Sequence, residues 1–328
     1  MSPISPRLID AAEYVACLPP AWQARALARP ESDWWQWRDM SVHIARVRNP
    51  AAKARLLILH GAGGHAGALW PAAALAASLG FEVLVPDLPG YGQTRVPDPG
   101  RVRYPDWVDC VSDLVRAENR AAAEGGKATP LVALGASMGG LLGYAVAART
   151  GEVAQLLVTC LLDPSNPVCW PALSRWGGAV SVRLLRPLVK PLAGAHAGAL
   201  ARLRVPIRWI APMHAIANQP ALTRLCLEDA RGGGGRVPLG FLASFLHSQP
   251  EVPPEQFRTT PVTLVHPAAD RWTPPAMSLA FFDRIAAPKR YVALTNCGHF
   301  PVEEPGMGEL AGVLEEVYQN SNRSSNLA

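Results

Sequence analysis

Charged residues are scarce in this sequence: Asp, Glu, Lys and Arg make up 17% of its 328 residues, whereas hydrophobic residues make up 49%. This composition is that of a globular protein and excludes an intrinsically disordered chain. Dense runs of Lys and Arg interleaved with aromatic residues are missing, which argues against a nucleic-acid-binding groove. The first residues also lack the apolar stretch of a secretory signal, so we expect a cytoplasmic protein.

The sequence also lacks the patterns of common cofactor sites. Its six cysteines, at positions 17, 110, 160, 169, 226 and 297, have neither metal-ligand spacing nor a paired framework, and we interpret them as free thiols. No Gly-x-Gly-x-x-Gly fingerprint follows the first buried strand that we predict, so no dinucleotide is expected. The sequence therefore predicts a protein without a metal or an organic cofactor.

Short apolar runs alternate with helical patterns along most of the chain. The runs that we predict as buried strands are 55–59, 82–86, 131–135, 155–162, 262–265 and 290–294, and a hairpin of edge strands at 34–40 and 41–47 precedes them. Strands that alternate with helices predict an α/β fold with a doubly wound, mostly parallel sheet.

The alternation of predicted strands and helices is interrupted at 164–254, a Pro-rich stretch of apolar helical pieces with no clear strand. This stretch holds ten Lys or Arg residues but only three carboxylates, so all of the net charge of +5 lies there. We predict that it is a mainly helical cap inserted into an α/β core. The core then consists of residues 1–163, with an N-terminal extension at 1–33, and residues 255–328.

The stretch from Leu131 to Ala148 carries the main chemical motif. An apolar run, long enough for a buried strand, leads into Gly135-Ala-Ser-Met-Gly139, and a helix-forming segment follows at once. The pattern Gly-x-Ser-x-Gly between a strand and a helix is typical of a nucleophile elbow, where the turn is sharp and the glycines make room for it. Ser137 is therefore the candidate nucleophile. The alternative is a Gly-rich run that only packs a helix closely on a sheet.

Residues 35–163 and 255–328 together resemble the α/β-hydrolase superfamily. The motifs stand in the order of that family: a His60-Gly61 loop, an Asp87-Leu-Pro-Gly-Tyr-Gly turn, the elbow, an Asp after a late strand and a late His. The resemblance is greatest to the serine-hydrolase branch that contains monoacylglycerol lipases, lysophospholipases and proline-type aminopeptidases. It implies an α/β-hydrolase fold and a Ser-Asp-His triad.

Within this resemblance, His299 is the expected base, because it follows the last strand in a loop and can reach over the sheet edge to Ser137. Asp270 is the expected acid that orients His299. Asp163 is a rival, because some members of the superfamily carry the acid after the preceding strand. The elbow serine excludes the relatives that use an Asp nucleophile, namely dehalogenases and epoxide hydrolases.

The oxyanion hole is expected to consist of two backbone N–H groups, those of Ala62 and Met138. His65, Trp272 and Phe300 are the expected substrate-binding side chains, in a pocket between the cap and the core.

We predict a serine hydrolase that cleaves carboxylic esters, acylglycerols or similar apolar acyl esters, through an acyl-enzyme. A proline-type aminopeptidase or amidase ranks lower, because the cap has only Glu228, Asp229 and Glu251 to hold a substrate ammonium group. A lactone hydrolase, a carbon–carbon hydrolase and a non-catalytic ligand-binding protein on the same fold also remain open.

The expected partner is a small-molecule acyl substrate, and the sequence does not indicate an oligomeric state. The stretch Arg183-Leu-Leu-Arg-Pro-Leu-Val-Lys190 is amphipathic and basic, which fits contact with a lipid surface. The alternative, which the sequence favours, is that its apolar residues belong to a small core of the cap with an ordinary solvated basic face.

Overall fold

Parallel strands form most of a single large sheet in the computed structural model, which describes residues 5–126, 129–175, 178–194 and 196–325. Within those residues the sheet has eight strands in the order β1-β2-β4-β3-β5-β6-β9-β10. The strands are β1 Glu31–Trp37, β2 Met40–Val47, β3 Arg55–Leu59, β4 Glu82–Pro86, β5 Leu131–Gly135, β6 Gln155–Val158, β9 Val262–Pro267 and β10 Lys289–Leu294. All pairs from β4 to β10 are parallel. The predicted α/β, mostly parallel sheet is confirmed.

The predicted N-terminal hairpin is also present, as β1 and β2 in antiparallel register from Glu31 opposite Arg46 to Trp37 opposite Met40. Its turn includes Arg38 at a φ of 53°. Of the two hairpin strands, only β1 lies at an edge of the sheet, because β2 pairs with β4 on its other side.

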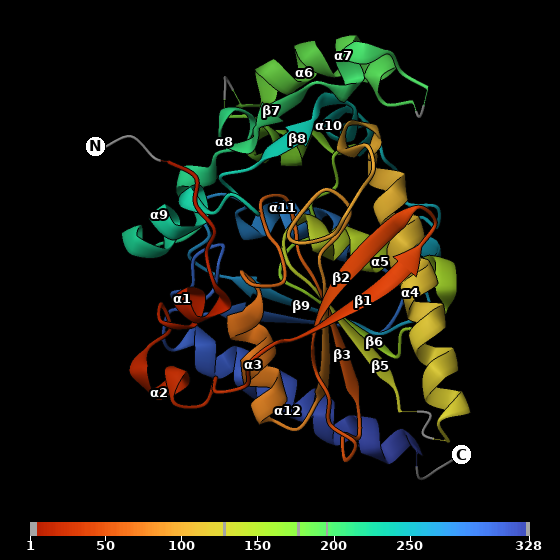
Figure 1. Cartoon of the computed structure of the whole chain (residues 1–328), viewed down its shortest axis with the longest axis vertical. Coiled ribbons are helices and arrows are strands. Elements are labelled where there is room, and N and C mark those ends of the chain that lie inside the picture. The colour runs from red at the N-terminus through yellow and green to blue at the C-terminus, as the bar shows by residue number, and fades with distance from the viewer. Residues whose placement is uncertain (1–4, 127–128, 176–177, 195, 326–328) are drawn as a thin grey trace.

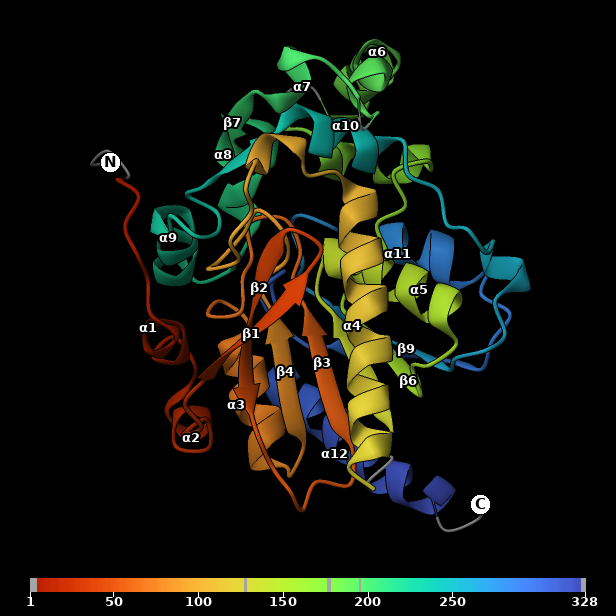
Figure 2. The same ribbon diagram turned by 45° about the vertical axis from the view of Figure 1, so that its right-hand side comes forward.

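Helices cover both faces of the sheet, and alternate side chains of the strands point to opposite layers. On one face, α3 (Trp70–Ser78) and α12 (Gly306–Ser325) share a buried apolar cluster with Ile58 and Leu134. On the other face, α4 (Tyr104–Glu124), α5 (Met138–Thr150) and α11 (Pro275–Phe282) pack against Leu57 and Ala133. Figures 1 and 2 show α3 and α4 on opposite sides of the strands.

The segment between β6 and β9 lies above the carboxyl ends of the strands in Figure 1. Its helices are α6 Gly178–Val189, α7 Ala199–Arg202, α8 Ile207–Ile210, α9 Pro220–Glu228 and α10 Leu239–Leu246. Contrary to the prediction of no strand here, β7 (Arg204–Pro206) and β8 (Arg236–Pro238) form a small antiparallel sheet. Each is an Arg-Val-Pro tripeptide, too short to show the alternation that marks a strand.

The N-terminal residues lie beside this inserted segment. Two short helices, α1 (Ala11–Val15) and α2 (Pro20–Gln23), lie in the N-terminal extension. The backbone of Arg7 forms a parallel bridge with Asp229, through Arg7 N–H to Glu228 O (2.7 Å) and Ala230 N–H to Arg7 O (2.8 Å). In the part of the chain that the structure describes, no helix is long and apolar enough to cross a membrane.

Candidate active site

Ser137 occupies the turn between β5 and α5 with backbone angles that L-residues rarely adopt, φ 55° and ψ −125°. Any Cβ on Gly135 would overlap the carbonyl of Gly139, and any Cβ on Gly139 would overlap the carbonyl of Leu59. The Ser137 N–H donates a hydrogen bond to Thr159 Oγ1 at 3.1 Å, which ties the turn to the chain beyond β6. The structure thus has the strained strand–turn–helix that the sequence motif predicts.

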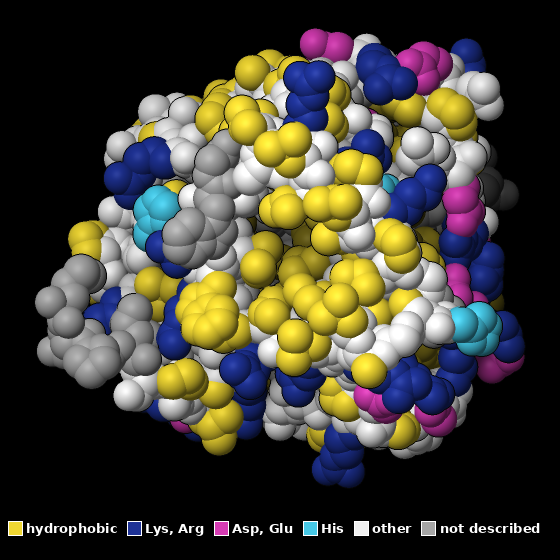
Figure 3. All heavy atoms as spheres, turned by 90° about the horizontal axis from the view of Figure 1, so that it is seen from above, with side chains coloured by type: hydrophobic (Ala, Val, Ile, Leu, Met, Phe, Trp, Pro, Cys, Tyr) yellow, Lys and Arg dark blue, Asp and Glu magenta, His cyan; other side chains and the backbone are white. Residues whose placement is uncertain are grey.

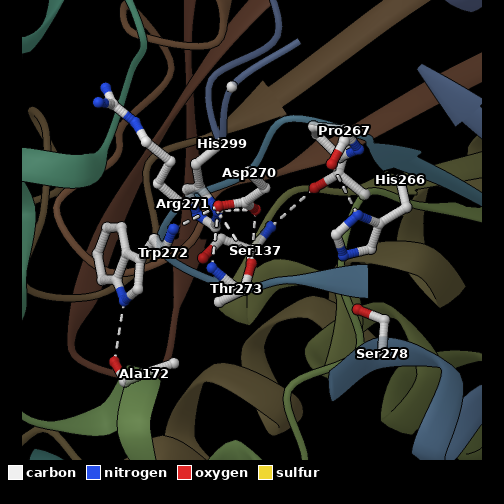
Figure 4. Close-up of polar contacts among 12 residues, drawn as sticks. Ser137, Ala172, His266, Pro267, Asp270, Arg271, Trp272, Thr273, Ser278 and His299 are labelled. Carbon is white, nitrogen blue, oxygen red and sulfur yellow. Dashed lines mark hydrogen bonds and ion pairs between the residues drawn. The ribbon is translucent and has the colours of Figure 1, made fainter. Parts of the chain in front are cut away.

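Asp270 and His299 come from loops after β9 and β10 and meet in a buried pair. His299 Nδ1 lies 2.8 Å from Asp270 Oδ2, and the two side chains are 4% and 0% exposed. Asp270 Oδ1 accepts hydrogen bonds from the backbone N–H groups of Trp272 (2.7 Å) and Thr273 (2.9 Å), and the Thr273 hydroxyl donates to Oδ2 at 2.7 Å. Figure 4 shows Asp270 within this set of contacts. The carboxylate is therefore held in one orientation toward the imidazole.

The electrostatics of the pair favour a charged Asp270. Burial alone would raise the pKa of this carboxyl group, but the charge and hydrogen bond of His299 and the hydrogen bonds from Thr273 lower it overall. An ionised Asp270 accepts a hydrogen bond from the Nδ1–H of His299, which leaves Nε2 of the ring available to act as a base. That Nε2 is buried and has no hydrogen-bond partner among the described residues.

The rival acid, Asp163, lies elsewhere. Its Oδ1 accepts hydrogen bonds from the backbone N–H of Ser165 (2.8 Å) and from the Ser165 hydroxyl (2.6 Å), so it closes a local turn after β6. Its carboxylate has no hydrogen bond to His299 within the parts of the chain that the structure describes. The structure thus brings His299 together with Asp270 and not with Asp163.

The loop after β3 lies directly against the elbow. A Cβ on Gly61 would be 2.9 Å from both Met138 N and Ser137 Cβ, so only glycine allows this approach. Met138 begins α5, and the N–H of a first helical residue has no partner within its helix. The proposed oxyanion donors, the N–H groups of Ala62 and Met138, therefore belong to two segments in contact beside Ser137.

His60 fixes the orientation of one of these donors. The Leu88 N–H donates to His60 Nε2 at 3.0 Å, so the ring proton is on Nδ1 and donates to the Gly61 carbonyl at 2.8 Å. That carbonyl belongs to the same peptide unit as the Ala62 N–H, and a trans peptide points the two in opposite directions. Burial lowers the pKa of His60 to about 4, which keeps the ring neutral.

His65, an expected substrate-binding residue, uses both ring nitrogens in hydrogen bonds within the protein. Gly67 N–H donates to Nδ1 (3.1 Å), so Nε2 carries the proton and donates to Asp229 Oδ2 at 2.6 Å. Asp229 also accepts a hydrogen bond from the Tyr14 hydroxyl at 2.8 Å. Sequence reasoning missed this network, because its three side chains are far apart in the chain and form no motif.

A run of four glycines, Gly232–Gly235, packs against the loop after β3. A Cβ on Gly232 would be 2.6 Å from the Gly63 carbonyl and 3.2 Å from the His65 ring. The backbone of this glycine run thereby lies against the candidate oxyanion loop, next to the Asp229–His65 hydrogen bond and the Met213 side chain.

Ser137 and His299 line one cavity, and most of its remaining walls are apolar. Phe300 lines it too, as expected, but His65 and Trp272 do not. Trp272 instead donates from Nε1 to the Ala172 carbonyl at 2.9 Å, and its ring lies 4.8 Å from that of His299, centroid to centroid. Residues 164–254 contribute Ile216 and Cys226 to the described lining, and the rest of that lining comes from the core.

The apolar residues of α6 also differ from the interpretation that the sequence favoured. Val180, Leu184, Leu185 and Leu188 are 52% to 72% exposed rather than packed in a core of the cap. Figure 3, a view onto the face above the sheet, shows hydrophobic side chains gathered around a hollow, with Lys and Arg near them.

Comparisons with known proteins agree with this fold. Residues 50–306 match the model of a family described as serine aminopeptidase, S33. A soluble variant of the monoglyceride lipase from Saccharomyces cerevisiae, solved with a substrate analogue, is 15% identical with a TM-score of 0.69, covering 90% of this chain and 96% of its own. The monoacylglycerol lipase from Paleococcus ferrophilus is 19% identical with a TM-score of 0.64, covering 85% of this chain and 98% of its own.

A third solved structure, an α/β hydrolase from a Penicillium species, is 16% identical with a TM-score of 0.64 and covers 90% of this chain and 99% of its own. At such identities the likeness concerns the fold alone. No curated protein matches this sequence.

Proposed function

The chain belongs to the serine aminopeptidase S33 family of α/β hydrolases, and on that premise we propose that it is a serine hydrolase that cleaves carboxylic esters of apolar acyl groups through an acyl-enzyme. One observation carries the proposal. Ser137, in a strained turn, shares a cavity with His299, whose buried Nε2 has no partner among the described residues and whose Nδ1 contacts Asp270.

In the proposed reaction, Ser137 Oγ attacks the ester carbonyl carbon while its proton moves to His299 Nε2. The tetrahedral intermediate collapses, and His299 returns that proton to the departing alcohol oxygen. Water then attacks the acyl-enzyme with His299 again as base, and the acid and free Ser137 are released. Asp270 stays ionised throughout and stabilises the imidazolium.

The developing negative charge on the carbonyl oxygen is proposed to be held by the N–H groups of Ala62 and Met138. Each such donor typically contributes about 10²–10³-fold in rate. The hydrogen bond from His60 to the Gly61 carbonyl supports this role, because it fixes the peptide that carries the Ala62 N–H before substrate arrives.

The family description also raises an aminopeptidase, but the carboxylates of the inserted segment do not favour one. Glu228 pairs with Arg7 and Arg224, and Glu251 pairs with Arg149. Asp229 is fully buried between His65 and Tyr14. The described lining of the cavity contains no Asp or Glu to hold a substrate ammonium group, so an ester of an uncharged acyl group fits better.

The exposed face of α6 is proposed to contact lipid surfaces that carry the substrate. Val180, Leu184 and Leu188 recur every four residues on this helix, and Arg183 and Lys190 beside them are exposed. Such a basic, apolar helix face fits the interface of a membrane or lipid aggregate, especially one with anionic head groups.

Residues 164–254 remain the proposed cap, and the cytoplasm remains the proposed compartment. The six cysteines are free in the structure, which is compatible with a reducing environment.

Hydrolysis of p-nitrophenyl and monoacylglycerol esters of increasing chain length tests the proposal, with Ser137→Ala as the control. We expect ester hydrolysis in the native protein, covalent labelling of Ser137 by a fluorophosphonate, and neither in the variant. Labelling without hydrolysis of any ester contradicts the ester assignment and favours an amide, lactone or carbon–carbon substrate. Absence of both reactions in folded protein contradicts a serine hydrolase and favours a non-catalytic binding protein.

A further inference from the structure

The cavity beside Ser137 extends into the body of the fold. Its walls include Ile58 of β3 and Leu134 of β5, whose side chains belong to the apolar cluster shared with α3 and α12. The helix that follows Ser137, α5, packs on the opposite face of the sheet. A group that reaches from Ser137 into this space therefore lies between the sheet and the layer of α3 and α12.

The walls of this inner space are apolar. They are formed by Ile58, Pro71, Ala72, Leu134, Met307 and Leu310, and we call this space the α3–α12 pocket. Among the described lining residues there is no Asp, Glu, Lys or Arg, and the polar side chains Ser137, Thr159 and His299 belong to the elbow and its surroundings. Such walls exclude a charged or strongly hydrogen-bonding group and suit a hydrocarbon chain.

The order of the reaction decides which half of an ester occupies the pocket. The acyl half stays attached to Ser137 after the alcohol has left, and water must then reach the same carbon. An alcohol held in the inner pocket would have to leave past the attached acyl group. An acyl chain held there leaves the open side of the cavity free for both alcohol and water.

We infer that the α3–α12 pocket binds one unbranched acyl chain of medium or greater length, while the alcohol faces the inserted segment. This inference rests on the proposed function and adds the position and chemical class of the acyl group. The empty space of the whole cavity, including its mouth that opens to solvent, is about 930 Å³. The core, rather than the cap, then selects acyl length.

Ala72→Phe tests the inference, because a benzyl group at this half-buried position on α3 takes up space in the pocket. The matched control is Ala77→Phe, on the same helix and packed on the same cluster but outside the cavity lining. If this benzyl group removes room for two methylene groups, kcat/KM for p-nitrophenyl decanoate, relative to that for the acetate, falls roughly fifteenfold, at about fourfold per methylene. The control keeps the native ratio.

A second pair of variants enlarges the pocket. Leu310→Ala shortens a side chain of α12 that lines the cavity. Leu314→Ala is the matched control, because Leu314 lies one turn later on α12, is buried and does not line the cavity. We expect the preferred acyl length to shift upward in Leu310→Ala only. Equal chain-length profiles in the native protein, Ala72→Phe and Leu310→Ala overturn the inference, although the protein then remains an esterase.

Binding gives a readout that does not depend on activity. Dodecanoate is titrated calorimetrically into Ser137→Ala and into Ser137→Ala with Ala72→Phe. Binding to the first protein that weakens in the second supports the pocket even if no ester is hydrolysed and the proposed function fails. No binding to the first, or equal binding to both, overturns it.

Discussion

The rings of Tyr14 and Phe300 lie stacked, with their planes 3° apart and their centroids 6.3 Å apart. Tyr14 belongs to α1, near the start of the chain, and Phe300 directly follows His299. Because the Tyr14 hydroxyl also donates to Asp229, one side chain of the N-terminal extension supports both the loop of the candidate base and the partner of His65.

Tyr14→Ala is therefore expected to reduce both stability and activity. Removal of a fully buried aromatic ring costs about 3–5 kcal/mol of unfolding free energy. Tyr14→Phe keeps the ring stacking and removes one of the hydrogen bonds to Asp229, at about 1 kcal/mol. Urea unfolding and ester kcat/KM are measured for both. Native stability and activity in Tyr14→Ala would show that the extension has no supporting role.

Substitution of the two candidate acids distinguishes their roles. Asp270→Asn is expected to lower kcat by about 10³–10⁴-fold, because an amide at this position no longer favours the Nδ1–H tautomer of His299. Asp163→Asn changes a local turn and leaves kcat within a few-fold of the native value. Steady-state kinetics with a p-nitrophenyl ester decide between them, and the reverse order of effects would assign the acid to Asp163.

Gly61→Ala is expected to lower kcat by about 10²–10³-fold, the value of one oxyanion donor. The new methyl group would lie 2.9 Å from Met138 N and Ser137 Cβ and would force the loop with Ala62 away from the elbow. Gly312→Ala, in α12 with no atoms near the added Cβ, is the control and keeps native kcat. If a folded Gly61→Ala protein had native kcat, the loop would not supply a donor.

Acid is expected to destabilise the fold through His60. Its pKa falls from 6.5 in the unfolded chain to about 4 in the fold, because of burial, so between these values the unfolded state binds more protons. The stability associated with neutral His60 is present above pH 6.5 and is lost as the pH falls through 6.5 toward 4. From pH 7 to pH 5 the loss is about 2 kcal/mol.

Urea unfolding at these two pH values measures this effect. His60→Asn keeps a donor for the Gly61 carbonyl but does not titrate, so its stability should fall by about 2 kcal/mol less than that of the native protein over the same range. An equal fall in both proteins would place the acid-sensitive group elsewhere, with His266, whose pKa burial also lowers, as the next candidate.

Leu184→Ser with Leu188→Ser tests the lipid contact of α6. A smaller fraction of the double variant should sediment with phosphatidylcholine vesicles that contain phosphatidylglycerol, because it lacks two exposed apolar side chains that would insert into the lipid. Leu27→Ser, at a residue that is 76% exposed beside α2, is the control and should bind as the native protein does. Equal vesicle binding in all three proteins, or none in the native protein, would contradict the proposal.

The parts of the site that follow strand ends were predictable from the sequence. Parallel strands bring their carboxyl ends to one edge of the sheet, so the residues after β5, β9 and β10 meet there. This is how Ser137, Asp270 and His299 come to neighbouring loops. The strands before Ser137 and Asp270 are short, mostly apolar buried runs, whereas β10, before His299, begins with the exposed Lys289 and Arg290.

Other features depend on contacts that no local pattern records. The Tyr14–Asp229–His65 network joins three segments that only the folded chain brings together. The strands β7 and β8 have three residues each, and their pairing rather than their sequence makes them strands. The α3–α12 pocket is a space between layers, which depends on how side chains from four elements fill the core.

The glycines on both sides of Ser137, Gly135 and Gly139, limit which sequences can form this turn. Gly135 and Gly139 exclude any side chain because backbone atoms of the sheet and helix already fill the space. A chain with another residue in place of Ser137 would still require both glycines to form this turn. Gly135 and Gly139 are therefore required by the packing of the turn, whichever side chain occupies position 137.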